Sequence, residues 1–459
     1  MGGYAQLVTV LADIQSWSPA LDAMLADAPP HAGLIEGAVT LAEHSFGWSI
    51  TDDGASRTGS PGTGHFRDAI YRIHQGLGEP VGAVLRASRA GLREVYIVQV
   101  PQNVSHGIGG NIVGDLVRED GALPALFRRQ PEPNPGVVPA PGADPAALAA
   151  LVSQKMPEAE PATVEEISVV EARLGVGLPE EVKALYLAAG SGELILHEDP
   201  ASAEFYGMDI IALGDDIRRQ AYLPENRFTA WRYGATESLT ADPTGRVQPL
   251  AGTALWFPIG TDGGGNVYCA DLAPAQNGRR GQVIFLDHES GAGAELVADS
   301  LTDLLVHQRL CPSAGPIRGG ATVYLNRVPI AEAAAHADLE VVCLGIGDTA
   351  VDLEPLAAQQ KVRTIDAGPR GLADPAQVNS FPALEYLSMK SADWRVLLDS
   401  QQVPRRLMAA HIEGADTLTT VAIANEILTS WGRPLITVTA LHLAPSARKR
   451  AWWRRAKPS

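Results

Sequence analysis

The chain has 459 residues, of which 46% are hydrophobic and 19% are charged, and its formal net charge at pH 7 is −17. This hydrophobic content excludes a disordered protein, because such proteins lack enough apolar residues to form a core. The acidic balance excludes a protein that binds nucleic acid with its whole surface, since affinity for phosphates comes from basic side chains.

The three cysteines, Cys269, Cys311 and Cys343, are too few and too widely spaced for a disulfide framework or a zinc site. The N-terminal residues lack the basic start and the apolar core of a signal peptide, and Gln6 stands where a myristoylation motif requires Ser or Thr. No uncharged apolar run reaches the ~18 residues of a membrane span. The sequence therefore predicts a cytoplasmic protein.

Two Pro- and Gly-rich stretches divide the chain. Residues 131–145 hold six prolines and no apolar periodicity, which is typical of a semi-rigid linker, and residues 311–320 form a weaker boundary. These stretches predict an N-terminal domain over residues 1–130, a central domain over 146–311, a third domain over 320–445 and a basic tail over 446–459. The acidic charge is concentrated in the centre, because residues 156–310 carry 10 basic and 24 acidic side chains, a net charge of −14.

The N-terminal block combines helix and strand signals and so predicts an α+β domain of unassigned type. Apolar residues at helical spacing predict a helix over residues 4–17, and β-branched and aromatic residues predict a strand over 92–100. The Gly-rich residues 106–110 precede a candidate helix over 111–118. A phosphate-binding loop is an alternative there, but the Walker lysine and the GxGxxG spacing are missing, which favours a flexible loop.

The central block begins with signals for two short helices. Thr163 and Glu166 have the spacing of a capping box, and Gly175 stands where a helix would end in a left-handed residue. Pro179 fits the first position of a second helix, which ends at Gly190.

Strand signals follow over residues 205–213, 255–259, 266–272 and 282–287, with a Gly-rich hairpin turn at 262–266. An apolar-faced helix over residues 301–310, capped by Ser300, closes the block. The order of elements, α-α-β-β-β-β-α, predicts an α+β domain with an antiparallel meander.

Several stretches of this block resemble the SUKH superfamily, which contains fungal cell-wall-assembly regulators and many bacterial immunity proteins. Residues 162–192, ATVEEISVVEARLGVGLPEEVKALYLAAGSG, are similar to its opening signature in their Leu-Gly turn, their Leu-Pro pair and their closing glycines. WFPIGTDGGGNVYCADL (256–272) and GQVIFLDHESG (281–291) resemble its core strands and Gly-rich turn. The resemblance covers residues 156–310. It implies binding rather than catalysis, because bacterial members bind and neutralise toxin domains, often nucleases, and it carries over no catalytic residue.

A nuclease toxin presents a basic groove to its substrate, so an acidic block would be steered to it electrostatically. The candidate partner-binding residues are the acids near strand ends and turns: Glu193, Asp199, Asp209, Asp215, Asp216, Asp262, Asp271, Asp287 and Glu289. The alternative is that these acids only keep the surface soluble. Three of the aspartates could suggest a calcium site, but their spacing does not fit the twelve-residue loop of an EF-hand.

The third block contains a repeated pattern of apolar residues. The motif LxxLxL begins at Leu339, Val362, Leu384 and Leu407, at spacings of 23, 22 and 23 residues, and a fifth copy begins at Leu435. This is the period of leucine-rich repeats, although the Asn or Cys that usually follows is absent. The block therefore resembles a degenerate leucine-rich-repeat solenoid of α/β type. The alternative is an ordinary α/β domain with a regular alternation.

In such a solenoid the variable positions of each strand line the concave face and would recognise a protein. These candidate positions are Glu340, Arg363, Asp366, Glu385, Tyr386, Ser388 and His411. The tail from Arg448 onward combines six basic residues with Trp452 and Trp453. Such a tail can be solvated, can contact an anionic membrane surface or nucleic acid, or can fold against the acidic central domain.

The sequence contains none of the usual catalytic motifs, whether a GxSxG elbow, an HExxH helix, a CxxC pair or a P-loop. Our leading hypothesis is a non-enzymatic, immunity-type protein that binds a basic toxin domain, which could be a nuclease, and uses no metal or cofactor. Two alternatives stay open. One is a regulatory scaffold that recruits cellular partners through the repeat block, and the other is an enzyme whose site in the N-terminal block is formed by His65, Asp68, His74 and His106.

Overall fold

The computed structural model describes residues 13–42, 45–52, 55–57, 64–74, 80–107, 112–197, 199, 204–227, 230–241, 244–312, 315–414 and 416–442. The chain forms two compact units. The first comprises residues 1–120, 390–401 and 410–459, and the second comprises residues 121–389 and 402–409. Most of the helix predicted over 4–17, most of the Gly-rich loop and the basic tail from Arg448 lie outside the described residues. Among the described helices, none is both long and apolar enough to cross a membrane.

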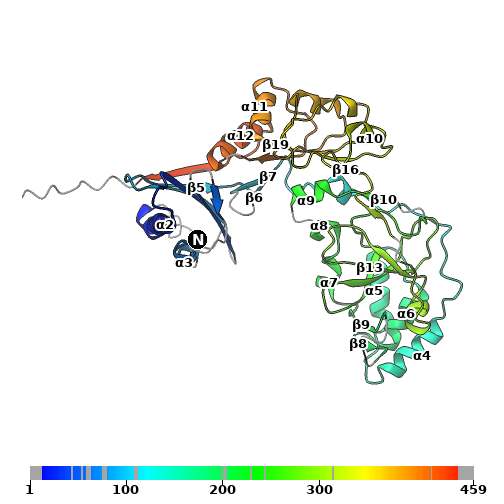
Figure 1. Cartoon of the computed structure of the whole chain (residues 1–459). Helices are drawn as coiled ribbons and strands as arrows, with labels where there is room; N and C mark the ends of the chain where they lie inside the picture. Colours follow the sequence, from blue (N-terminus) through cyan, green and yellow to red (C-terminus); the bar gives the residue numbers. More distant parts are fainter. Residues whose placement is uncertain are drawn as a thin grey trace, which may run out of the picture. The chain divides into compact units, whose positions relative to one another are not determined.

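The first unit contains an antiparallel sheet with two helices against it (Figure 1). The strand order is β21-β5-β4-β1-β2-β3. The helices are α2 (Ile14–Asp27) and α3 (Gly64–His74), and the strands are β1 (Leu34–Leu41), β2 (Phe46–Asp52), β3 (Ala55–Arg57), β4 (Val81–Ser88), β5 (Arg93–Gln99) and β21 (Thr437–His442). Trp17, Leu21 and Met24 of α2 and Phe66 of α3 are fully buried against the sheet, so the apolar faces of both helices supply the core.

The rest of the first unit contains β6 (Val104–His106), β7 (Val113–Val117), α11 (Ser391–Asp399), β20 (Ala409–Glu413) and α12 (Thr417–Ser430). The strand predicted over 92–100 is confirmed by β5. The helix predicted over 111–118 is wrong, because β7 occupies this stretch and pairs with β6, burying Val113 and Leu116. The fifth repeat is also wrong, because its residues form β21, which pairs antiparallel with β5.

The second unit contains a six-stranded antiparallel sheet in the order β14-β13-β12-β11-β9-β8, with α4, α5 and α6 against it (Figure 1). The helices are α4 (Pro145–Lys155), α5 (Val164–Leu174) and α6 (Glu180–Ala188). The strands are β8 (Gly192–Ile195), β9 (Gly207–Ile210), β11 (Trp256–Thr261), β12 (Val267–Asp271), β13 (Val283–Leu286) and β14 (Glu295–Ala298). The predicted antiparallel meander is therefore present, extended by β8 and β14, which the sequence signals missed.

Residues of both sheet faces are buried. On one face Phe257 and Ile259 of β11 pack with Leu148, Ile167 and Leu185 of the three helices. On the other face Trp256 packs with the irregular residues around Val247 and Leu250. Because neighbouring side chains along a strand point to opposite faces, Trp256 and Phe257 belong to different cores, and the strand is apolar without alternation.

The capping residues predicted at both ends of α5 are present in the structure. Thr163 Oγ1 accepts a hydrogen bond from the Glu166 amide at 3.2 Å, and the Glu166 carboxylate accepts one from the Thr163 amide at 2.7 Å. Gly175 ends the helix with a φ of 71°, in the left-handed region. The predicted capping box and C-terminal glycine of α5 are therefore confirmed, whereas Pro179 lies one position earlier than predicted, just before α6.

Replacing Thr163 with Ala is expected to lower the free energy of unfolding by about 1 kcal/mol, because the first turn of α5 loses its hydroxyl acceptor. Hydrogen exchange followed by mass spectrometry should show faster exchange confined to the start of α5. Ser168→Ala is the control, since Ser168 lies exposed within the same helix. Equal effects of the two substitutions would contradict this role of the cap.

The Pro-rich stretch 131–145 is held along the second unit. The Glu132 amide donates to Gln248 Oε1 at 2.8 Å, the Asn134 side chain donates to the Pro274 carbonyl at 2.9 Å, and the Asp144 amide donates to Thr302 Oγ1 at 2.9 Å. Proline fixes the backbone of such a stretch, so only a few hydrogen bonds are needed to hold it in place.

The remaining elements of the second unit include short helices, a two-stranded pair and four parallel strands. The short helices are η1 (Ala125–Arg128), α7 (Asp216–Gln220), α8 (Pro224–Arg227), α9 (Trp231–Thr236), η3 (Thr302–Val306), α10 (Ile330–Ala334), η4 (Glu354–Leu356) and η5 (Pro375–Ser380), and the two-stranded pair is β10 (Leu239–Thr240) with β15 (Ile317–Arg318). The parallel strands are β16 (Thr322–Tyr324), β17 (Val341–Cys343), β18 (Thr364–Asp366) and β19 (Tyr386–Lys390). The middle residues of three predicted repeats, Val342, Ile365 and Leu387, share one register position.

Candidate functional site: an acidic groove

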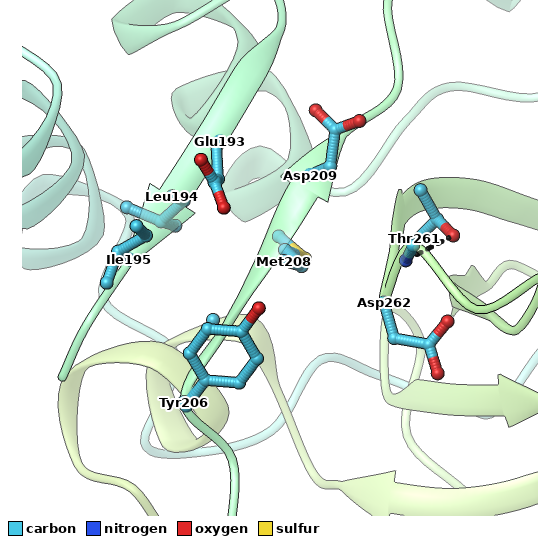
Figure 2. Close-up of a pocket in the computed structure, with 10 residues that line it drawn as sticks. Glu193, Leu194, Ile195, Tyr206, Met208, Asp209, Thr261 and Asp262 are labelled. Atoms are coloured by element: carbon cyan, nitrogen blue, oxygen red, sulfur yellow. Dashed lines mark hydrogen bonds between the residues drawn. The ribbon is translucent and has the colours of Figure 1, made fainter. Parts of the chain in front are cut away.

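A groove of about 370 Å³ lies at the β8 edge of the six-stranded sheet (Figure 2). Its geometry follows from the strand register. β9 pairs with β11 only at Ile210 and Asp209, and it continues along β8 through Met208 and Gly207. Beyond Thr261 the chain turns away from β9, so Met208 and Gly207 have β8 on one side and the turn after β11 on the other. The groove is the space between these two walls.

Gly207 is needed for the close approach of β8 and β9. A Cβ atom at this position would lie 2.2 Å from the Leu194 carbonyl oxygen, far inside van der Waals contact. Glycine therefore allows the two strands to pair up to the end of the groove.

Three carboxylates surround the groove, and all three were predicted partner-binding residues. Glu193 comes from β8, Asp209 from β9 and Asp262 from the turn after β11 (Figure 2). Glu193 and Asp209 are direct cross-strand partners, and Thr261 is the partner of Asp209 on the other side. None of the residues that line the groove is basic. The structure thus brings together acids from three separate stretches of sequence.

The Asp262 carboxylate also shapes its own turn. Its Oδ1 accepts hydrogen bonds from the Gly264 amide at 2.8 Å and the Asn266 amide at 3.2 Å, and its Oδ2 accepts one from Asn266 Nδ2 at 2.7 Å. Gly263 and Gly265 have positive φ angles, as a tight glycine-rich turn requires. The turn therefore holds the Asp262 side chain at a defined place beside the groove.

Aromatic and apolar side chains form the body of the groove. Met208 of β9 and Tyr206, just before β9, line it on one side, and Ile195, which is 42% exposed, lines it from β8. Tyr268 lies nearby, where burial and the charge of Asp262 raise its pKa to about 12. An apolar floor inside an acidic rim is typical of a surface that binds a protein.

Two further predicted acids lie in the turn that follows β13. Asp287 accepts hydrogen bonds from Ser290 Oγ at 2.6 Å and the Glu289 amide at 2.9 Å, and these bonds lower its pKa. The backbone amide of His288, between Asp287 and Glu289, donates to Asn266 Oδ1 at 3.0 Å. Asn266 therefore links this turn to the Asp262 turn, and Asp287 and Glu289 extend the acidic surface beside the groove.

This domain matches a known family. Residues 161–307, about a third of the chain, match the model of the SMI1 / KNR4 family (SUKH-1). Residues 161–307 therefore form a SUKH domain. The match confirms the resemblance inferred from the opening signature and the core strands. No curated protein matches the chain. SUKH domains are generally non-catalytic binding modules, so this part of the chain is suited to binding a protein.

The other predicted acids of the SUKH domain are not among the residues that line the groove. Asp199 is exposed in the loop between β8 and β9, and Asp215 is half-buried before α7. Asp216 begins α7 and forms an ion pair with Arg173. Asp271 is fully buried, so its role as a surface contact is wrong. It ends β12 facing the interior, where it accepts hydrogen bonds from Gln282 Nε2 at 2.9 Å and the Ala273 amide at 3.0 Å.

Burial of the Asp271 carboxyl raises its pKa to about 7. In the unfolded chain an aspartate titrates near pH ~3.9, so between these two values the folded protein binds the extra proton. The contribution of Asp271 to stability is therefore greatest at low pH and is lost as the pH rises to about 7.

Urea unfolding of the native protein and of Asp271→Asn tests this pH dependence. The native protein should lose more stability than the variant between pH 5 and pH 8, because the amide does not titrate. Asp287→Asn is the control, since the pKa of Asp287 is lowered and this carboxylate stays ionised throughout the range. Parallel stability curves for the native protein and Asp271→Asn would contradict the titration of Asp271.

The predicted concave positions are covered by the chain itself. Glu340 lies 2.6 Å from Arg129, and Glu385 lies 2.6 Å from Arg128. Arg363 lies 3.0 Å from Glu340 and donates to the carbonyls of Ala235 and Glu237 in and after α9. Tyr386 is fully buried, with its ring stacked on Trp231 at a centroid distance of 6.3 Å. These four positions therefore do not line an open surface, because η1 and α9 occupy it.

The other three predicted positions of the concave face also do not form an open surface that could bind a partner. Ser388 is fully buried and Asp366 is half-buried. His411 lies in the first unit, where it is 4% exposed and its Nδ1 is 3.1 Å from Asp115 Oδ1.

The structure does not gather the histidines and the aspartate of the N-terminal block into one site. His65 contacts Asp27 at 3.0 Å, His74 contacts the Ala42 carbonyl at 2.5 Å, and Asp68 contacts Arg67 at 3.1 Å. His106 lies on β6, where burial lowers its pKa. In the part of the chain that the structure describes, no group of three or more His, Cys, Asp or Glu side chains could hold a metal ion.

Proposed function

We propose that the SUKH domain binds a basic toxin domain through its acidic groove and thereby blocks the active surface of that toxin. The observation that carries this proposal is the convergence of Glu193, Asp209 and Asp262 around one groove without a basic residue. In this role the protein acts in the cytoplasm as an immunity protein, and a nuclease is the toxin class whose basic substrate groove best complements these acids.

The charge of the domain supports fast and selective association. Residues 156–310 carry a net charge of −14, and a concave acidic surface concentrates the electric field. Opposite charges on two proteins raise the association rate and make it sensitive to salt. The groove provides a defined binding site for a partner that is attracted by the net charge of the domain.

The cross-strand arrangement of two acids also supports a binding role. Glu193 and Asp209 are directly opposite each other on β8 and β9, and like charges at such positions destabilise a sheet by a few tenths of a kcal/mol or more. An Arg or Lys of a partner, placed between them, would convert this repulsion into two attractions. Tyr206 beside them offers the kind of aromatic anchor that dominates binding energies at protein interfaces.

Co-expression tests this function. A toxin domain encoded next to this gene should be lethal to cells when it is expressed alone and harmless together with the full-length protein. The purified pair should form a complex whose association rate falls at least tenfold between about 50 and 500 mM salt, because steering is screened. Absence of a complex, or a complex indifferent to salt, would contradict the proposal.

We also propose that the parallel strands β16 to β19 are a degenerate leucine-rich-repeat solenoid. Their in-register parallel pairing at intervals close to the repeat length supports this. The scaffold hypothesis is less well supported, because Arg363, Glu385 and Tyr386 contact η1 and α9 rather than an open surface. We therefore assign partner binding to the groove of the SUKH domain.

A further inference from the structure

The chain carries two segments of strongly opposite charge. Residues 156–310 have a net charge of −14, whereas the basic tail, residues 446–459, has six basic side chains and no acidic one. No comparable cluster of basic residues occurs elsewhere in the sequence. Charges attract each other over about one Debye length, roughly 10 Å at 0.1 M salt, so the tail is drawn to acids that lack a cation of their own.

The acidic groove contains such acids. None of the residues that line it is basic, and among the described residues Glu193 and Asp262 form no ion pair with Lys or Arg. Asp216 of the same domain, by contrast, is paired with Arg173. The groove is therefore a place where the negative charge of the domain stays uncompensated.

The carboxylates of the groove come from both of its walls (Figure 2). On one wall Glu193 and Asp209 are cross-strand partners, which places two negative charges side by side. On the other wall Asp262 is fixed by hydrogen bonds from its own turn at 2.7 to 3.2 Å, so it needs no rearrangement to meet a cation. Carboxylates on two walls suit a segment with several cations better than a single one.

The basic tail has side chains that fit this groove. Arg450 and Arg454 stand on either side of Trp452 and Trp453 in the sequence. Guanidinium groups form strong charge-assisted hydrogen bonds with carboxylates, and Trp and Arg dominate binding energies at protein interfaces. Met208 on the apolar floor of the groove offers an adaptable contact for an indole ring.

A nucleic acid or an anionic membrane also attracts a basic and aromatic tail. Either of them would repel the rest of the same chain, however, because residues 156–310 carry a net charge of −14. The groove attracts the tail without this repulsion, and groove and tail are always present in equal numbers. The charges of the chain therefore favour the groove as the site that the tail occupies.

We propose that the basic tail occupies the acidic groove until a toxin domain displaces it. This inference rests on the proposed function, because it uses the same cation-selective groove. The tail then acts as a built-in competitor. A weakly basic protein does not displace it, whereas a toxin domain with a larger complementary surface does, so the tail sharpens the selectivity of the groove.

A peptide with the sequence of residues 446–459 tests the site by calorimetric titration. The protein is the full chain with its own tail neutralised by six substitutions: Arg448→Gln, Lys449→Gln, Arg450→Gln, Arg454→Gln, Arg455→Gln and Lys457→Gln. At about 50 mM salt the peptide should bind this tail variant with a Kd of about 10 µM or lower, and at about 500 mM salt at least tenfold more weakly. A Kd above about 1 mM at low salt would overturn the proposal.

Substitutions in the groove show whether the peptide binds there. Amides at the three groove positions of the tail variant should weaken peptide binding at least tenfold: Glu193→Gln, Asp209→Asn and Asp262→Asn. A matched control removes three exposed charges on α5, α8 and β14 and should weaken it less than threefold: Glu165→Gln, Glu225→Gln and Glu295→Gln. Equal losses would show that the peptide responds only to the net charge of the domain, which would overturn the proposal.

Competition in the native chain shows whether the groove is already occupied. The native protein should bind the peptide at least fivefold more weakly than the tail variant at the same low salt, because its groove already holds a tail. Equal affinities would overturn the proposal, since the groove of the native protein would then be empty. A difference that grows with protein concentration supports occupancy by the tail of a second copy.

A toxin domain separates this inference from the proposed function. A toxin domain that the native protein neutralises should associate at least threefold faster with the tail variant, because the groove is free. If the peptide binds the groove and no toxin domain does, the proposed function fails and the inference stands. If a toxin domain binds the groove and the peptide does not, the inference fails and the proposed function stands.

Discussion

Replacing Glu193, Asp209 and Asp262 with their amides should weaken binding of the toxin domain by roughly 100-fold. Close charge pairs at an interface contribute about 1 kcal/mol each or more, and three of them together correspond to about two decades in Kd. The amides keep the size of the side chains. The amide oxygen introduced by Asp262→Asn would still accept hydrogen bonds from the Gly264 and Asn266 backbone amides, and only the bond from Asn266 Nδ2 loses its acceptor, so the turn should keep most of its hydrogen bonds. Most of the loss should disappear at about 500 mM salt, where the native protein also binds weakly.

A second triple variant separates the groove from the charge of the whole domain. Glu165→Gln, Glu225→Gln and Glu295→Gln remove the same three charges from exposed positions on α5, α8 and β14, and β14 is the edge strand opposite β8. This variant should lose less than threefold in Kd, measured by stopped-flow and calorimetric titration against the same toxin domain. Equal losses in the two triple variants would show that only net charge matters.

Replacing Arg363 with Met should lower the free energy of unfolding by about 3 kcal/mol. Removing one partner of a buried ion pair leaves the other charge without compensation, which costs about 3–5 kcal/mol. The lower value applies here, because Glu340 and Glu385 keep their contacts with Arg129 and Arg128. The side chain also donates to the Ala235 and Glu237 carbonyls, so its loss should release α9.

Urea unfolding measures this effect, and hydrogen exchange followed by mass spectrometry at α9, whose Trp231 stacks on Tyr386, measures the release of α9. Lys361→Met is the matched control, because Lys361 lies two positions before Arg363 in the sequence. It pairs with Asp338, and both of these side chains are more than half exposed. Exposed pairs contribute little, so this control should unfold at nearly the same urea concentration as the native protein. Similar shifts in both variants would show that the Arg363 pairing is not a major source of stability.

The local elements of the SUKH domain could be predicted from the sequence because their signals involve neighbouring residues. The hydrogen bonds of Thr163 with Glu166 span three residues, and the left-handed Gly175 ends the helix by its own conformation. β11, β12 and β13 are continuous apolar runs separated by glycine-containing turns, and this pattern predicts the antiparallel meander. In contrast, β8 has only four residues and an exposed Glu193 in the middle, which gives neither an alternating nor an apolar pattern.

For the groove, the sequence predicts that the binding residues are acidic, but it does not predict which of them lie together. Their position near strand ends and turns predicts Glu193, Asp209 and Asp262 as binding residues, but their grouping depends on the register of β8, β9 and β11. Asp271 satisfied the same sequence criterion and is buried, because the end of β12 turns toward Gln282. A single sequence does not show which side of a strand end faces the solvent.

The prediction that the variable repeat positions line an open concave surface is wrong for a different reason. Arg363 and Tyr386 stand at variable positions of the repeat, where side chains point to one side of the strands. The repeat pattern says nothing about what covers that side, and the covering segments, η1 and α9, lie more than 100 residues earlier in the chain. Only the long-range contacts of Arg128, Arg129 and Trp231 show that this face is filled.

The pairing of β21 with β5 has a consequence for the synthesis of the protein. Thr437 and Gln99, which face each other across these strands, are 338 residues apart. A ribosome needs roughly 20–70 s to add that many residues at ~5–20 residues per second. During this time the apolar strand β5 has a free edge, and such edges promote aggregation. We therefore expect the nascent chain to depend on a chaperone or on slow, late folding, because its N-terminal sheet is completed only after residues 437–442 have been made.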